Sequence, residues 1–534
     1  MMDRMPFPMP HPPRRSRAIA VALAAVLALT ACSTGLLRPE GPPLTALDHA
    51  ADTPAAQLRW LDRVSWGANA NSQAELARDG LPRWMGRQLR PAPRALPAAV
   101  QAQIDAMAIS RTPFDQLVFA LDARRKAADA LPDEEAKKAA RAAYQQELNT
   151  LAREAQQRFL LRALYSPNQL QEQMTWFWMN HFNVSIRKDL VRAMVGDYEE
   201  NAIRPHALGK FRDLLGATAR HPAMLRYLDN AQNAANRINE NYARELMELH
   251  TLGVGGGYTQ ADVQELARVL TGVGVSVQPP GATPPAVRAA VRADYVRQGL
   301  FEFHPNRHDY GPKTLLGQPI QSRGLAETDE ALDRLARAPA TARFISRKLA
   351  VYFVADEPPP ALVERMAATF TRSDGDIAAT LQTLFESREF AASLGRKFRD
   401  PVHYVVAGVR LAYDERVVLN TTPMIGWINR MGQTLYAHET PDGYPLNEAA
   451  WASAGQMNTR FEIARAIGMS GAVLFRTDDK APLEKPPFPP LAESRAVRAL
   501  QPGLSADTQQ ALAQAKNPPE WNTFLLASPE LMRR

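Results

Sequence analysis

The residues with the clearest chemical potential lie in the stretch 239–257, NENYARELMELHTLGVGGG. If this stretch is helical, a rotation of about 100° per residue places Glu245 and Glu248 about 60° apart. Both carboxylates can then face one space. His250 would lie about 140° from Glu245, so we place it outside the pair. Two neighbouring carboxylates can help to bind a divalent metal ion or transfer protons.

Two other segments offer partners for these carboxylates. His181 stands in WMNHF, and His308, Asp309 and Lys313 stand in HDYGPK. A histidine beside two carboxylates can hold a divalent metal ion or act as a general acid or base. His308 and Asp309 precede a tight turn, where they could activate a water molecule. The candidate ligand-binding side chains are Asn241, Arg244 and Lys313.

Each candidate also has a structural interpretation. His181 lies among aromatic residues, as a hydrogen-bonded core histidine does. The two glutamates can pair with Arg244 or with buried backbone groups, and Arg244 also stands four residues after Glu240. His308 and Asp309 can cap the turn. The sequence does not establish that the three segments meet, and a bound metal stays an open possibility.

The elements that must position these residues are mostly helical. The range 133–165 carries apolar residues at steps of three and four, and the range 168–183 is aromatic on several sides, as in a buried helix. The range 275–290 is rich in proline and predicts a surface loop. Short apolar runs around a Gly/Pro turn predict a β-hairpin or extended element near 300–320. The expected fold is therefore mainly α, a large multi-helix body with one small β element.

The N-terminus has the pattern of an export signal. Residues 1–31 combine arginines with a short apolar run, and LTAC ends at Cys32, the only cysteine. LTAC resembles the bacterial lipobox, so Cys32 is the predicted lipidation site; a plain signal peptide is the alternative. Residues 32–57 read as a flexible Pro/Ala-rich tether. We expect lipid anchoring to a membrane, at the outer membrane facing the periplasm.

Two further ranges complete the expected organisation. Residues 58–475 form the helical domain, and residues 476–534 form a Pro-rich segment with a C-terminal helical tail. The formal charge of +7 is not gathered into a basic, aromatic-interleaved stripe, so nucleic acid is not an expected partner.

Several reaction classes find no support in the motifs. The glycines at 253–257 precede no GK[ST], and no strand is expected before them, so a P-loop is disfavoured. No GxSxG motif is present, which disfavours that class of serine hydrolase. A single cysteine at the lipidation site leaves no thiol for catalysis or metal binding in the mature fold.

Several segments resemble, in order, the motifs of the bacterial domain of unknown function 1800 family. They are RVSWGANANSQAEL, QMTWFWMNHFNVS, NENYARELMELHTLGVGGG, HDYGPKTLLGQ and ISRKLAVYFV. Two segments depart from the family pattern: LTGV stands for LTGW at 270–273, and HETPDGYPLNEAAW at 438–451 departs from the tail motif. The resemblance implies a mainly helical, exported bacterial protein, and it implies no particular reaction.

Two functions follow as hypotheses. The first is a hydrolase of the cell envelope, acting by acid–base chemistry or with a divalent metal, with Glu245, Glu248, His181, His308 and Asp309 as catalytic candidates. The second is a non-catalytic binding or assembly factor for secreted or envelope components. Its partner would be a protein of the same export system.

Overall fold

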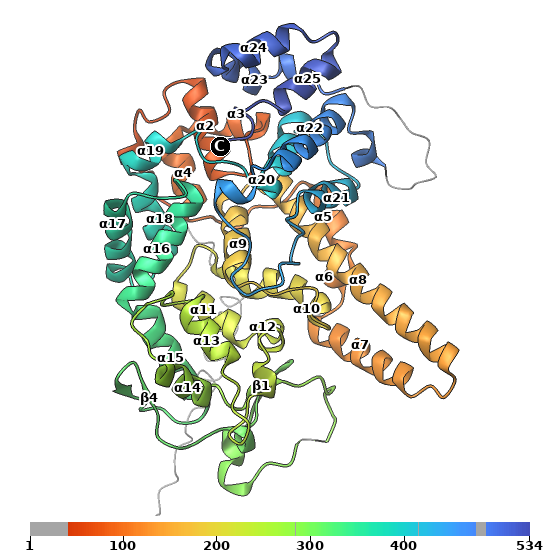
Figure 1. Cartoon of the computed structure of the whole chain (residues 1–534), viewed down its shortest axis with the longest axis vertical. Helices are drawn as coiled ribbons and strands as arrows, with labels where there is room; N and C mark the ends of the chain where they lie inside the picture. The colour runs from red at the N-terminus through yellow and green to blue at the C-terminus, as the bar shows by residue number, and fades with distance from the viewer. Residues whose placement is uncertain (1–40, 284, 415, 477–487) are drawn as a thin grey trace, which may run out of the picture.

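The computed structural model describes residues 41–283, 285–414, 416–476 and 488–534. In these ranges the chain forms a body of many helices with two small antiparallel sheets (Figure 1). The predicted mainly α class with a small β element is therefore confirmed. The predictions of a signal peptide and of lipidation at Cys32 lie outside the described residues.

The first α-helices of the described chain cover one end of the body: α2 (Pro54–Val64), α3 (Ala70–Asp79) and α4 (Leu81–Leu89). Helix α2 begins inside the range 32–57 that was expected as a flexible tether. Leu44, Leu47 and Ala51 of that range are buried, so its second part packs on the body. Asn69 and Ser72 form a capping box at the start of α3, which fixes where that helix begins. A proline-containing coil then leads from residue 90 to two short helices, α5 (Ala98–Asp105) and α6 (Ala108–Arg111).

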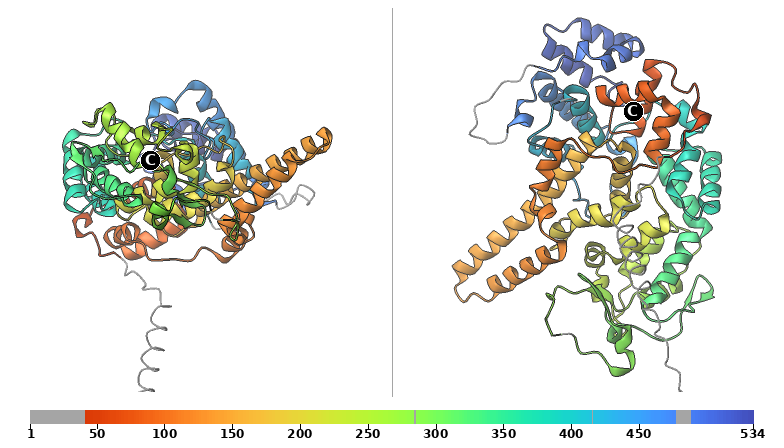
Figure 2. Two further views of the ribbon diagram at one scale, coloured as in Figure 1. Left: turned by 90° about the horizontal axis from the view of Figure 1, so that it is seen from below. Right: turned by 180° about the vertical axis from the view of Figure 1, so that it is seen from behind.

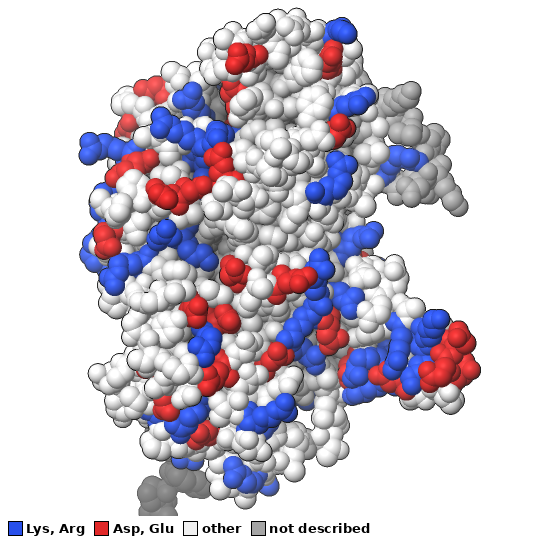
Figure 3. Space-filling model, viewed as in Figure 1, with Lys and Arg blue, Asp and Glu red and all other residues white. Residues whose placement is uncertain are grey.

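A helical hairpin projects from the body (Figures 1 and 2). It consists of α7 (Phe114–Asp129) and α8 (Glu134–Tyr165), and the predicted helix over 133–165 is confirmed with Asp133 as its N-cap. The inner part of α8 buries its apolar stripe in the core: Leu148, Leu151, Ala155 and Phe159. The outer part carries mixed charge on its surface (Figure 3).

The aromatic segment forms α9 (Gln169–His181), which runs through the centre of the body. All of its residues except Gln171 are buried. A helix that is apolar on most sides must be enclosed by other elements, so this prediction is confirmed. The next helices pack beside it: α10 (Val191–Asp197), α11 (Phe211–Arg220) and α12 (Pro222–Tyr227).

The motif helix is shorter than expected. The stretch 239–257 was considered as a helix, but α13 spans only Asn241–Glu248 and the chain then turns. The following helix, α14 (Gln260–Val269), begins at a capping box formed by Thr259 and Asp262. The two helices pack against each other.

The β element follows α14. Strands β1 (Val273–Val275), β2 (Val296–Gln298) and β3 (Phe301–Phe303) form an antiparallel sheet in the order β1-β3-β2. A hairpin of β4 (Thr314–Leu315) and β5 (Gln318–Pro319) lies beyond it. The Pro-rich stretch connects β1 to a short 3-10 turn before β2.

Helices complete the chain. One layer consists of α15 (Leu325–Arg337), α16 (Pro339–Phe353), α17 (Pro360–Arg372), α18 (Ile377–Phe385) and α19 (Arg388–Ser393). The last set consists of α20 (Pro401–Tyr413), α21 (Thr422–Arg430), α22 (Ala454–Met469), α23 (Arg495–Leu500), α24 (Ala506–Ala513) and α25 (Pro518–Leu526). Helix α25 packs along α22, and Arg533 pairs with Phe398 as an antiparallel bridge. The described C-terminal residues therefore belong to the same packed body.

Candidate functional site

A buried histidine at the end of α9 forms the centre of the candidate site. The His181 ring is 1% exposed, and its Nε2 lies 3.1 Å from the backbone oxygen of His250. A carbonyl only accepts, so Nε2 carries the proton and Nδ1 is left as an acceptor. The ring is thus neutral. Burial, and then the cation of Lys348, hold the pKa of His181 well below its usual range.

Lys348 of α16 provides the cation. Its Nζ lies 3.0 Å from Nδ1 of His181, to which it donates a hydrogen bond. The side chain is half-buried, and among the described residues no carboxylate lies within ion-pair distance of Nζ. Burial lowers the pKa of Lys348 to about 8, and the charge of Asp442 opposes this only in part.

The two glutamates of α13 lie at the edge of the same region. Both side chains are half-buried. Burial, and then the neighbouring carboxylate of Glu248, raise the pKa of Glu245, while Arg244 opposes the shift. Asp442 is close enough to influence the pKa values of both Glu245 and Lys348. Asp442 is therefore the charged group that the surroundings of Glu245 and Lys348 have in common.

Asp442 belongs to a long loop between α21 and α22, and asparagines of the α9 motif hold this loop in place. Asn180 Nδ2 donates to the Tyr444 oxygen at 2.9 Å, and Asn180 Oδ1 accepts from the Tyr444 nitrogen at 2.7 Å. Asn183 Nδ2 donates to the backbone oxygen of Thr440 at 2.8 Å. Gly443 has a φ of +76°, and a Cβ there would lie 2.1 Å from the Asn180 oxygen. The close approach requires glycine.

The tip of this loop carries further polar groups. The Thr440 hydroxyl lies 3.0 Å from Nε2 of His438 and donates to Oδ1 of Asp442 at 2.5 Å. The Asp442 side chain is 62% exposed. The loop therefore places an accessible hydroxyl, imidazole and carboxylate at the solvent side of the site.

The structure brings together only part of the predicted set. His181 lies beside Lys348, and the charge of Asp442 acts on both Lys348 and Glu245, whereas His308 and Lys313 belong to a second cluster, centred on Glu327 of α15. Nε2 of His308 lies 3.2 Å from Glu327 Oε1, and Nζ of Lys313 lies 2.7 Å from Oε2. Within the described chain, no hydrogen bond, ion pair or ring contact links His308 or Lys313 to the first region.

The remaining predicted residues stabilise local structure. Asp309 pairs with Arg268 at 2.7 Å and accepts from the Gly311 nitrogen at 2.8 Å, so it caps its turn. Asn241 donates to the Leu228 oxygen at 3.1 Å. Arg244 pairs with Glu240 at 3.0 Å.

His250 was placed outside the carboxylate pair on helical geometry. Because α13 ends at Glu248, that geometry does not apply to it. The ring of His250 is buried, with its centroid 6.1 Å from that of His181. Burial lowers the pKa of His250 to about 3, so this ring is also neutral.

Metal binding has a specific geometric requirement. A protein site for zinc usually takes at least three His, Cys, Asp or Glu ligands converging on one point. No group of three such side chains with this arrangement occurs in the described ranges. An ammonium of lowered pKa beside a neutral imidazole can take part in proton transfer.

A family model described as "Protein of unknown function (DUF1800)" matches residues 59–533. The chain belongs to the DUF1800 family. Comparisons with curated proteins and with solved structures find no match. The DUF1800 match extends through the C-terminal helices α23 to α25, which pack into the same body.

The site of this DUF1800 protein also contains residues that the sequence did not identify. Lys348 lies in ISRKLAVYFV, one of the segments that resemble the family motifs, but it was not among the predicted site residues. Asp442 lies in the segment that departs from the family's tail pattern. The signal that the sequence offered was a lysine next to the apolar residues of a helix, at the border of its buried face.

No helix in the described part of this DUF1800 chain is both long enough and apolar enough to cross a membrane.

Proposed function

We propose that this DUF1800 protein is a lipid-anchored hydrolase of the bacterial cell envelope that works by acid–base catalysis. Glu245 acts as the general base that activates water, and Lys348 acts as the general acid that protonates the leaving group. A raised pKa makes a carboxylate a stronger base, and a lowered pKa makes an ammonium a stronger acid. His181 positions Lys348 through its hydrogen bond.

The observation that carries this proposal is the 3.0 Å contact between Lys348 Nζ and the neutral His181 ring. A half-buried lysine normally has a carboxylate partner, because burying an unpaired charge is costly. Lys348 has a neutral acceptor in its place, so its proton is held less firmly and is available near neutral pH. This arrangement supports proton donation and does not require a metal ion.

The pKa of Lys348 can be measured without a substrate. Amine-selective acetylation, read by mass spectrometry across pH 6 to 11, should label Lys348 with a midpoint near pH 8. An exposed lysine such as Lys138 serves as the internal control. Equal midpoints for Lys348 and the control lysine would show that the pKa of Lys348 is not lowered, and would exclude Lys348 as the general acid.

Activity is tested on a panel of carboxylic esters, phosphoesters and glycosides. Glu245→Gln and Lys348→Met should each lower turnover of the preferred class by about 10²–10⁴-fold. Glu240→Gln on the same segment is the control, because Glu240 pairs with Arg244 at 3.0 Å and should leave turnover unchanged. Equal turnover in all variants, or no hydrolysis of any class, would refute the hydrolase.

Localisation at a membrane is a separate part of the proposal and rests on LTAC and the tether. Cys32→Ser should move the protein from the membrane fraction to the soluble fraction, and radiolabelled palmitate should no longer be incorporated. Retention of the variant in the outer membrane would exclude a lipid anchor at Cys32.

A second candidate function, an assembly factor for envelope components, is supported by the projecting hairpin of α7 and α8 (Figure 2). Its exposed charges pair with each other, as Arg141 does with Asp129 at 2.9 Å. Shortening the hairpin by replacing its outer residues 128–142 with a short turn should then abolish co-purification of a partner from the same export system and leave hydrolysis intact. Unchanged co-purification would exclude the hairpin as the contact.

A further inference from the structure

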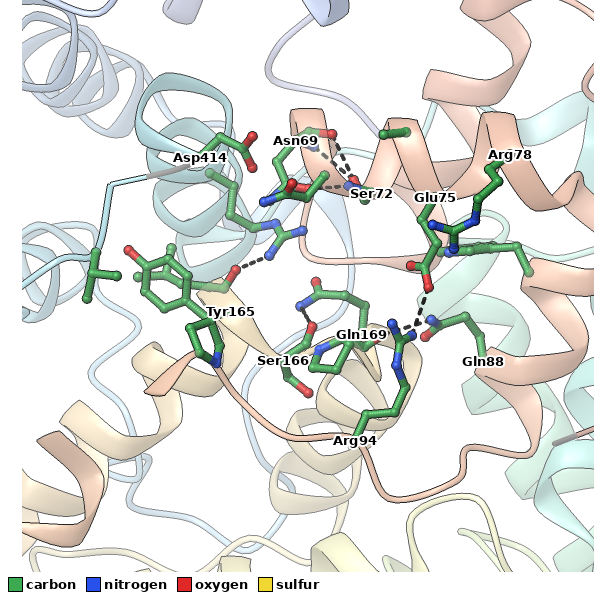
Figure 4. Close-up of a pocket in the computed structure, with 18 residues that line it drawn as sticks. Asn69, Ser72, Glu75, Arg78, Gln88, Arg94, Tyr165, Ser166, Gln169 and Asp414 are labelled. Carbon is green, nitrogen blue, oxygen red and sulfur yellow. Dashed lines mark hydrogen bonds and ion pairs between the residues drawn. The ribbon is translucent and has the colours of Figure 1, made fainter. Parts of the chain in front are cut away.

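A polar hollow lies at the opposite end of α9 from His181. It has a volume of about 420 Å³ and is enclosed by α3, α4, the coil before α5, and the C-terminal ends of α8 and α20 (Figure 4). This volume lies within the range of small-molecule sites. The first segment of the DUF1800 resemblance, RVSWGANANSQAEL, forms one wall through Asn69, Ser72 and Glu75.

A buried arginine lines this hollow. Arg410 of α20 is 4% exposed; its Nε donates to the Gly67 oxygen at 2.9 Å, and its Nη1 donates to the backbone oxygens of Ala163 and Leu164. Within the described ranges, its Nη2 has no hydrogen-bond partner and the guanidinium forms no ion pair. Burial lowers its pKa to about 10, so it stays charged at neutral pH. The carboxylates of Asp414 and Asp62 are near enough to favour the charged form of Arg410.

A second arginine reaches over the hollow from the coil. In Figure 4, Arg94 extends towards Glu75 of α3, and its Nη1 lies 2.8 Å from Glu75 Oε1. Its other guanidinium nitrogens have no partner among the described residues, and the side chain is 35% exposed. The charged lining is Arg78, Arg94 and Arg410 against Glu75 and Asp414, three positive and two negative groups, a balance of +1.

The amide side chains of the lining are already occupied. Gln88 donates to the Pro167 oxygen at 2.9 Å and accepts from the Leu170 nitrogen at 3.0 Å. Gln169 accepts from the Trp66 nitrogen at 3.0 Å and donates to the Ser166 oxygen at 2.8 Å. These residues fix the walls, so the guanidinium donors of Arg94 and Arg410 are the groups left for a ligand.

A neighbouring hollow lies on the other side of Arg94. It measures about 340 Å³, lies across the coil, and shares Arg94 and Ser166 with the first. Two other arginines line it, but both already pair with carboxylates: Arg162 with Glu200 at 2.9 Å, and Arg204 with Glu172 and Glu200. Arg94 is therefore the cation that the two hollows share.

We propose that the hollow between α3, α4 and α20 is a binding site for a small organic anion, a molecule with a carboxylate or phosphate group and further hydroxyl groups. The anionic group binds Arg94 and Arg410, because planar guanidinium groups pair well with carboxylates and phosphates. The site is distinct from the His181 and Lys348 region and does not depend on the hydrolase proposal.

Isothermal titration calorimetry on the full chain tests the site at constant ionic strength. The probes are glucuronate, inorganic phosphate, glucose 6-phosphate and neutral glucose. One of the three anions should bind, glucose should not, and the anion that binds best assigns the carboxylate or the phosphate. Binding of glucose as tight as that of the anions, or no binding of any probe, overturns the proposal.

Matched variants localise the binding. Arg94→Gln should weaken binding of the anion about tenfold, which corresponds to the loss of one charged contact. Arg90→Gln is the control: Arg90 lies on the same segment, pairs with Asp376 at 2.7 Å and does not line either hollow. Equal weakening in both variants would show a general effect of charge and overturn the site. Arg410→Met should abolish binding; if it does not fold, Arg94→Gln decides the result.

Discussion

The two clusters of histidine, lysine and carboxylate in this protein have similar composition but different surroundings. In the first, Lys348 contacts the neutral ring of His181, and the nearest acidic groups lie at a half-open edge. In the second, Lys313 and His308 both contact Glu327, and their side chains are 1% and 0% exposed. Among the described residues, Lys348 of the first cluster has no ion-pair partner, whereas Lys313 of the second cluster pairs with Glu327.

This difference indicates a chemical role for the cluster of Lys348 and a structural role for the cluster of Glu327. A sealed, neutralised cluster cannot reach a substrate, but it ties the 308–313 segment to α15. A partly buried lysine without an ion-pair partner lowers the free energy of unfolding. Such a lysine is a candidate for a functional role, because it can release its proton near neutral pH. Charge pairing and access therefore distinguish the two clusters better than residue type does.

The largest expected effect comes from breaking the sealed cluster. Glu327→Gln leaves the buried cation of Lys313 without its partner, which should lower the free energy of unfolding by about 3–5 kcal/mol. Urea denaturation measures this loss. The control is Asp333→Asn on the same helix, whose carboxylate is 42% exposed and should contribute less than about 1 kcal/mol. Equal losses in the two variants would contradict a structural role for the Glu327 cluster.

The next largest effect concerns the loop that carries Asp442 and is held by Asn180 and Asn183. Gly443→Ala places a Cβ 2.1 Å from the Asn180 oxygen and should destabilise the protein by about 2 kcal/mol, with the loss confined to the loop. Hydrogen exchange of residues 436–447 measures the local opening. Gly432→Ala is the control, because it has a φ of +86° but open space around its Cβ, so it reports backbone strain alone. Equal exchange in both variants would mean that the close contact with Asn180 is unimportant.

The sequence predicted the helices far better than it predicted the site. The stripe on α8 and the aromatic surface of α9 follow from local periodicity, which a single segment contains in full. The pairing of His181 with Glu245 and Glu248 stays a prediction, because no hydrogen bond, ion pair or ring contact in the described chain joins His181 to either glutamate. His308 offered the same residue types, but its position depends on how the β4–β5 hairpin packs against α15, which no local pattern encodes.

Lys348 shows why the site itself was harder to predict. Its partner His181 is 167 residues earlier in the chain, and Asp442 is 94 residues later. Nothing within ISRKLAVYFV indicates that this lysine lacks a counter-ion, because that property depends on distant segments. The loop carrying Asp442 was set aside as a departure from the family pattern, although asparagines on both sides of His181 hold it.

The stability of the protein should depend on pH through Lys348. Its pKa is about 8 in the fold, below the unfolded value near ~10.4, so between these values the unfolded chain binds more protons. The free energy of unfolding contributed by this group therefore rises with pH over that window. Relative to Lys348→Met, the wild type should gain about 1–2 kcal/mol from pH 8 to 10, after allowance for partial solvent screening.

Guanidinium denaturation of both proteins at each pH measures this difference. Comparing the two proteins cancels the titration of the buried tyrosines, which also changes at high pH. Lys313→Met is unsuitable as a substitute, because it breaks an ion pair and would lower stability at every pH. A constant difference between wild type and Lys348→Met across the window would mean that the pKa of Lys348 is normal.

The smallest expected effect concerns the two glutamates of α13, Glu245 and Glu248. Glu248 is one of the causes that raise the pKa of Glu245, so Glu248→Gln should lower that pKa towards its ordinary value. Carbodiimide labelling of protonated carboxyl groups, read by mass spectrometry from pH 4 to 7, should show the midpoint of Glu245 moving to lower pH. Glu265→Gln, on α14 and paired with Arg268 at 2.7 Å, should leave the midpoint unchanged. If neither variant moves the midpoint, burial alone sets the basicity of Glu245, and the second glutamate has no part in tuning the proposed base.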